Sequence, residues 1–192
     1  MTGSTMQKIP NPQGKGLVPV LRDLARSRPA SPPPPKQIDQ IAGELFTSLF
    51  VLSSEFAFRP VVGRSYWLYR IDGKFKLLLL APDDWSAGHP GRFIGECVLR
   101  EDVTWTLTLD GEAARDASLL RRLEVERRRL QGSLEQADSL EEAMPVYVAS
   151  LPFYRRLLAY GLGGSLRLSM QAAGINTLGY DEARGLLTRT AS

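Results

Sequence analysis

Hydrophobic and polar positions in the middle of the chain follow the short periods of an antiparallel sheet. Apolar runs at Tyr66–Ile71 and Phe75–Ala81 are separated by an Asp-Gly pair, which favours a type I′ hairpin turn because both turn residues take positive φ. The second run is apolar at both parities, so we expect an inner strand covered on both faces. A third strand is expected over 93–99. A fourth is expected over 103–109, where apolar residues alternate with threonines as in a half-exposed strand.

Helical periods flank this sheet in the sequence. Residues 37–58 carry apolar side chains every three or four positions and predict a buried helix. Residues 112–137 carry a narrow apolar seam among many charges and predict a solvated helix. We expect these two helices to cover opposite faces of the sheet. Further helices are expected from the capping-box serine Ser139, over 151–160 with the sequence GLGG at 161–164 as a stop, over 165–173 and over 181–188.

Together these patterns predict an α+β protein with a small antiparallel sheet of about four strands packed by helices. We expect three regions. They are a disordered basic leader (1–36), a helix-plus-sheet module (37–110) and a helical C-terminal region (111–192) that packs on the module or extends from it. The length allows one ordinary core, and no stretch is apolar enough to span a bilayer, so no membrane contact is expected.

The leader differs from the remaining chain in charge and composition. It holds six basic residues against one acidic residue, or +5, which leaves −2 for the rest of a chain whose total is +3. Its run of four prolines predicts an extended spacer, and its low apolar content predicts disorder. An apolar cluster interrupts it at Leu17, Val18, Val20 and Leu21. Two hypotheses stay open for this cluster: it docks on its own chain, or it is a linear motif that binds a partner.

A series of aromatic and glycine positions is specific enough to suggest a family. The series is YWLY at 66–69, Gly73, APDDW at 81–85, FIG at 93–95 and DVTWT at 102–106, preceded by NPQGKGLVPVL at 11–21. This order resembles an uncharacterised domain-of-unknown-function family (the DUF2452 type) shared by bacterial and eukaryotic proteins. The resemblance covers roughly residues 8 to 110. It implies no activity, cofactor or catalytic residue.

Candidate catalytic chemistry is sparse. His89 is the only histidine and lies in a glycine-proline turn, whereas the only cysteine, Cys97, has the apolar parity of a predicted strand. We therefore expect a buried, inert thiol rather than a nucleophile. Structural zinc needs four Cys or His ligands, so neither a metal nor another cofactor is predicted, and no catalytic residue is assigned. A lone cysteine cannot form an internal disulfide, which fits a cytoplasmic location.

The sequence favours a non-enzymatic interaction or adaptor protein with a protein partner. Its predicted partner-binding residues are Lys15, Leu17, Val18, Val20 and Leu21 in the leader, with Trp67 and Trp85 as secondary candidates because such aromatics are common at interfaces. The alternative is an RNA- or ribosome-associated protein whose basic leader and Arg121–Arg129 face meet phosphates. Its predicted residues are Lys8, Lys15, Arg22, Arg26, Arg28, Arg121 and Arg128. An enzyme that works through carboxylates stays open as a third hypothesis.

Overall fold

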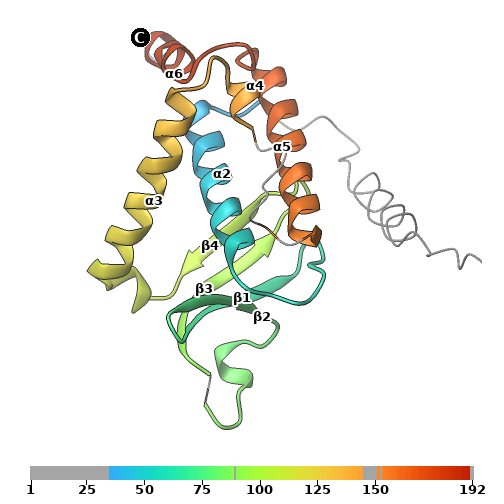
Figure 1. The fold of residues 1–192 in the computed structure, drawn as a ribbon, viewed down its shortest axis with the longest axis vertical. Helices are drawn as coiled ribbons and strands as arrows, with labels where there is room; N and C mark the ends of the chain where they lie inside the picture. Colours follow the sequence, from blue (N-terminus) through green and yellow to red (C-terminus); the bar gives the residue numbers. More distant parts are fainter. Residues whose placement is uncertain (1–34, 89, 145–150, 152, 191–192) are drawn as a thin grey trace, which may run out of the picture.

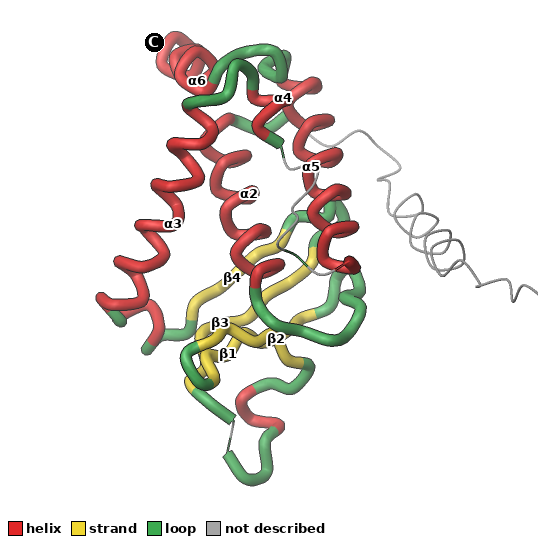
Figure 2. Tube along the Cα trace, viewed as in Figure 1, coloured by secondary structure: helices red, strands yellow, loops and turns green. Residues whose placement is uncertain are grey.

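The computed structural model describes residues 35–88, 90–144, 151 and 153–190 of the chain. The leader, apart from Pro35 and Lys36, therefore lies outside the described residues. The described part is a four-stranded antiparallel sheet with helices packed on one of its faces (Figures 1 and 2). The prediction of an α+β protein with about four strands is confirmed.

The sheet is built from two adjacent hairpins. Its strands are β1 (Ser65–Ile71), β2 (Lys74–Leu78), β3 (Arg92–Leu99) and β4 (Trp105–Leu109). They lie in the order β2-β1-β3-β4, and all neighbours are antiparallel. The turn residues Asp72 and Gly73 have φ of 50° and 77°, so the type I′ turn is confirmed.

The position of the second strand differs from the prediction. We expected 75–81 to be an inner strand, but β2 lies at the edge of the sheet and ends at Leu78. Leu77 is buried, whereas Leu79 and Leu80 are 57% and 43% exposed. The inner-strand prediction was wrong because apolar residues at both parities can also arise where a strand leaves the sheet beside an open apolar groove.

The helix α2 (Ile38–Ser53) crosses the sheet and supplies one side of the core. Buried Leu45 and Leu52 belong to the same core as Tyr66 and Trp105. The Trp105 backbone N–H donates to Ser48 Oγ at 2.9 Å, so a buried helix hydroxyl satisfies a strand donor. This bond fixes the beginning of β4 beneath the helix.

The second long helix does not cover the opposite face. A short 3-10 turn (Ala113–Arg115) precedes α3 (Ala117–Glu135), and Asp116 caps α3 by accepting from the backbone N–H of Ser118 at 2.8 Å. Figure 1 shows α3 beside α2, on the same side of the sheet. The prediction that the two helices sandwich the sheet is therefore wrong, and a loop between β2 and β3 lies under the other face instead (Figure 2).

The C-terminal region consists of α4 (Leu140–Ala143), α5 (Phe153–Ala173) and α6 (Tyr180–Thr190). Ser139 accepts from Glu142 N–H, which confirms the predicted helix start, although α4 is only one turn long. The predicted stop at 161–164 is wrong, because α5 runs through these glycines. Leu162 and Leu166 on this helix are completely buried. Burial of this stripe outweighs a helix cost of about 1 kcal/mol per glycine.

The beginning of the described chain is tied to the core by a buried cation. Lys36 is 6% exposed, and its Nζ donates to Glu44 Oε2 and Asp102 Oδ2, each at 2.6 Å. Asp102 Oδ1 also accepts from Thr104 Oγ1 at 2.6 Å. Burial by itself raises the pKa of Asp102. The hydrogen bonds from Lys36 and Thr104 together lower this pKa by more than burial raises it, so the net shift is downward. Lys36 therefore joins α2 to the β3–β4 hairpin.

Candidate functional site

Most of the predicted partner-binding and nucleic-acid-binding residues lie outside the described residues. These are Lys8, Lys15, Leu17, Val18, Val20, Leu21, Arg22, Arg26 and Arg28. His89 is also outside them. The leader-based site and the Cys/His pair therefore stay predictions, and the surfaces below consist of described residues only.

Trp85 fixes the β2–β3 loop against the sheet. Its Nε1–H donates to Tyr69 Oη at 3.3 Å, and the Tyr69 hydroxyl donates to the Leu80 carbonyl at 3.1 Å. The Trp85 and Tyr69 rings meet edge to face at 6.3 Å, and Phe93 packs on Tyr69 at 5.4 Å. Burial raises the pKa of Tyr69, so its hydroxyl stays protonated as a donor. The loop therefore holds Leu80 in place beyond the end of β2.

Trp67 is half-buried and lies in β1 directly opposite Leu78 of β2. Strand alternation places it on the face of the sheet away from α2, because its neighbour Leu68 is in the helix-covered core. Trp67 thus belongs to the helix-free side, whereas Trp85 contributes to the groove described next.

An open apolar groove of about 690 Å³ follows the outer edge of β2. We call it the β2-edge groove. One wall is the segment after α2, the other is the end of β2 with the residues beyond it, and Trp85 and Arg155 complete the lining. Its lining residues are Glu55, Phe56, Ala57, Phe58, Lys76, Leu77, Leu78, Leu79, Leu80, Trp85 and Arg155.

The backbone along this groove is only partly paired. Glu55 N–H donates to the Phe75 carbonyl at 2.8 Å, and Leu77 N–H donates to the Glu55 carbonyl at 2.9 Å, forming one parallel bridge. Phe75 and Leu77 therefore direct their backbone groups away from β1, and Leu79 lies in the bend that directly follows the last residue of β2. Among the described residues, no hydrogen-bond partner is found for Leu79 N–H. The edge of the sheet is thus covered at one bridge and open beyond it.

The charged residues of the groove are engaged with their neighbours. Arg155 donates to the carbonyls of Leu52, at 3.3 Å, and Ser54, and its guanidinium lies 5.2 Å from the centre of the Phe56 ring. Glu55 pairs with Lys74 at 3.0 Å, and this hydrogen bond lowers its pKa. With these charges paired, the accessible surface of the groove is mainly aliphatic and aromatic.

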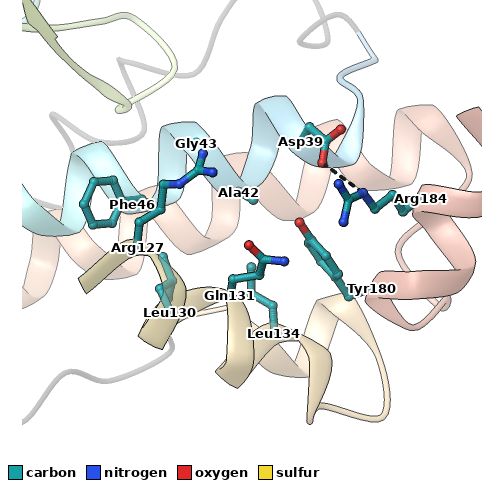
Figure 3. Close-up of a pocket in the computed structure, with 10 residues that line it drawn as sticks. All are labelled: Asp39, Ala42, Gly43, Phe46, Arg127, Leu130, Gln131, Leu134, Tyr180 and Arg184. Atoms are coloured by element: carbon teal, nitrogen blue, oxygen red, sulfur yellow. Dashed lines mark ion pairs between the residues drawn. The ribbon is translucent and has the colours of Figure 1, made fainter. Parts of the chain in front are cut away.

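A second groove, the α2–α3 groove, consists of two adjoining hollows of about 600 and 270 Å³ that share Phe46 and Leu130. The larger is lined by Phe46, Leu49, Phe50, Ser53, Phe75, Arg122, Glu126, Arg129, Leu130 and Ser133. The smaller, shown in Figure 3, is lined by Asp39, Ala42, Gly43, Phe46, Arg127, Leu130, Gln131, Leu134, Tyr180 and Arg184. Asp39 and Arg184 close its far end with an ion pair of 3.8 Å.

The predicted phosphate-binding arginines on α3 already have partners within that helix. Arg128 Nε lies 2.8 Å from Glu124 Oε1, and Arg127 Nε lies 3.3 Å from the other oxygen of the same carboxylate. Arg121 Nε donates to the Ala117 carbonyl at 3.1 Å. Neither Arg121 nor Arg128 lines either groove.

The thiol environment agrees with the prediction of a buried cysteine. Cys97 is completely buried in the core, and burial raises its pKa to about 12, with the charge of Glu96 adding to the effect. In the part of the chain that the structure describes, no three His, Cys, Asp or Glu residues gather closely enough to hold a metal ion. The described helices include none with the length and apolar character needed to cross a membrane.

Comparisons with protein-family models, with curated protein sequences and with solved structures found no match to this chain. The family resemblance suggested by the aromatic series therefore stays a prediction. The described residues form an α+β fold that carries two open grooves.

Proposed function

We propose that this chain is a non-enzymatic interaction protein that binds an extended segment of a protein partner along the β2-edge groove. One observation carries the proposal: among the described residues no partner is found for the backbone N–H of Leu79, directly beyond the end of β2, and the side chains of Leu79 and Leu80 beside it are exposed. An extended peptide would both accept a hydrogen bond from this N–H and cover these side chains, because its backbone continues the sheet while its alternate side chains enter the groove.

The groove gives such a segment a defined direction and register. The Glu55 bridge already occupies the outward groups at Phe75 and Leu77 N–H, so the incoming strand pairs with the next outward groups, from the Leu77 carbonyl to Leu79. Its inward side chains would contact Phe56 and Phe58. Burying the exposed parts of Leu79 and Leu80 contributes roughly 1–2 kcal/mol each, and each new main-chain hydrogen bond about 1 kcal/mol. The partner segment is therefore apolar, short and extended.

The leader is the second part of the proposal. Its apolar cluster from Leu17 to Leu21, with Lys15, is proposed to contact a protein partner, and the support is the sequence pattern alone. Lys36 fixes the root of this leader beside α2 and the β3–β4 hairpin. A cytoplasmic location belongs to the same proposal, because the only cysteine is a buried thiol.

The groove is tested with peptides selected from a random display library on the full-length protein, followed by calorimetric titration of the selected sequences. We expect extended peptides with apolar residues at alternate positions. Leu79→Pro removes the N–H donor, and Leu79→Asp places a charge in the groove, so each should weaken binding about tenfold or more. Leu79→Ala keeps the N–H and should weaken it less.

Leu120→Asp is the matched control, because Leu120 is a similarly exposed leucine on α3 and should bind as the wild type does. Equal affinity of wild type and Leu79→Pro, with all variants folded, would refute strand addition. The leader is tested separately by deleting residues 1–30. We expect an unchanged melting temperature and unchanged affinity for the groove peptides, but loss of the partner contacts that the leader supplies. If the partner contacts of the leader weaken steeply as the salt concentration rises, the RNA alternative is favoured instead.

A further inference from the structure

The α2–α3 groove has the dimensions of a helix-binding site. Its α2 wall repeats every three or four residues, from Ala42 through Phe46 and Phe50 to Ser53. This stretch is about three turns, or roughly 17 Å, long. Figure 1 shows α3 close to α2 near α6 and separating from it toward the sheet, and the larger of the two hollows is the one that includes Phe75 of the sheet.

The floor of this groove is aromatic and incompletely covered. Phe46 and Phe50 are both half-buried, and their rings stack at 6.3 Å. Phe50 meets Phe75 of β2 edge to face at 5.0 Å, and the Arg122 guanidinium lies 6.0 Å from the centre of the Phe75 ring. The larger hollow therefore presents aromatic surface beneath a cationic rim, and this surface is available to an apolar side chain.

The rim is positive on a domain that is otherwise negative. Four arginines line the two hollows against two acids, giving +2, whereas residues 37–192 together carry −2. Everything outside the groove in that region therefore sums to −4. The lining arginines are Arg122, Arg127, Arg129 and Arg184, and the acids are Asp39 and Glu126. A positive rim favours an occupant that carries acidic side chains.

The walls also determine the conformation of the occupant. Both are helices, whose backbone groups are already bonded internally, so they offer side chains but no backbone partners to an incoming chain. A segment that buries itself here has to satisfy its own backbone hydrogen bonds, which a helix does. We propose that the α2–α3 groove binds an amphipathic helix of a protein partner, with its apolar stripe on Phe46 and Phe50 and its acidic flank facing Arg122 and Arg129.

This surface shares no lining residue with the β2-edge groove, so it is tested independently. The probes are two fluorescent synthetic peptides about 16 residues long with the same leucine stripe at helical spacing, one flanked by glutamates and the other by lysines. Fluorescence anisotropy against the full-length protein at about 50 mM NaCl gives both affinities. We expect the glutamate peptide to bind at least about tenfold more tightly than the lysine peptide.

The double variant Arg122→Glu/Arg129→Glu should reverse this preference. The matched control is Arg121→Glu/Arg128→Glu, which makes the same charge change on exposed positions of α3 outside the groove lining and should keep the preference for glutamate. Circular dichroism confirms that both variants fold. The inference is overturned if the glutamate peptide does not bind, if both peptides bind equally, or if the control variant reverses the preference as well. It is also overturned if single-stranded RNA displaces the glutamate peptide and binds more tightly.

Discussion

Replacing Lys36 by methionine tests the ion-pair network that ties the start of the described chain to the core. Lys36 Nζ is the shared donor to Glu44 and Asp102, and its side chain is 5% exposed. Methionine keeps most of the apolar stem but removes the charge. The variant therefore leaves two largely buried carboxylates facing each other, with only the more distant Arg100, 3.9 Å from Glu44, as a cationic neighbour.

The expected loss of unfolding free energy is about 4 kcal/mol. Two hydrogen bonds to charged groups contribute about 1.5–3 kcal/mol each, and removing one partner of a buried pair costs about 3–5 kcal/mol. For a chain of this size, such a loss lowers the melting temperature by about 10 °C. Lys74→Met is the matched control. Lys74 pairs with Glu55 at 3.0 Å but is 68% exposed, so its loss is expected to cost less than about 1 kcal/mol.

The loss of stability depends on pH with a defined sign. The pKa of Asp102 is lowered in the folded protein, so its stabilising effect is complete above the unfolded pKa, about 3.9, and is lost as pH falls through the folded value. In urea unfolding, the difference in unfolding free energy between wild type and Lys36→Met should therefore be constant near neutral pH. This difference should become smaller below about pH 5, because the unpaired carboxylates of the variant take up protons.

Two results would refute this reasoning. A loss at neutral pH no larger than that of Lys74→Met would mean that the Lys36 network adds nothing beyond a surface pair. A difference that becomes larger on acidification would mean that the stabilising partner of Lys36 is not an ionised carboxylate.

Three further predictions concern the sheet and its core. Gly95→Ala should cost about 3 kcal/mol or more in thermal unfolding, because its Cβ would overlap the Thr108 carbonyl oxygen; a cost below about 1 kcal/mol would contradict the close β3–β4 approach. Cys97 should resist a thiol reagent at neutral pH until the protein unfolds, because burial raises its pKa to about 12; rapid labelling of the native protein would contradict this. Leu77→Asp should lower the unfolding free energy by several kcal/mol and Leu79→Asp by less than about 1 kcal/mol, because Leu77 is buried and Leu79 is exposed. Equal urea midpoints for the two variants would mean that Leu79 is also buried in the core.

Local signals predicted the hairpins well. The Asp72-Gly73 turn, the strand from Arg92 to Leu99 and the capping serine Ser139 all depend on residues close together in the sequence. Strand order and the side of the sheet that each helix takes depend on distant contacts. Periodicity therefore could not show that α2 and α3 share one face, or that burial of Leu162 would carry α5 through a glycine run.

The grooves were missed for a related reason. The segment from Glu55 to Phe58 was predicted as the end of a helix, although α2 ends at Ser53 and Glu55 forms a single bridge to β2. The leucines at 77–80 could have indicated the β2-edge groove, because an apolar run that extends beyond the end of its hairpin partner can belong to an exposed sheet edge. The α2–α3 groove carries no such signal, since it arises from the divergence of two helices.

Hydrogen exchange at the Leu79 amide tests the central claim most directly. The measurement compares the backbone amides of the full-length protein by NMR, alone and with a saturating library-selected peptide. In the free protein, the Leu79 amide, which has no partner among the described residues, should exchange rapidly, whereas Leu77, bonded to Glu55, should be protected. The peptide should slow exchange at Leu79 at least about tenfold and leave Leu120 unchanged. An unchanged rate at Leu79, with the peptide bound and protection elsewhere, would contradict strand addition at the β2 edge.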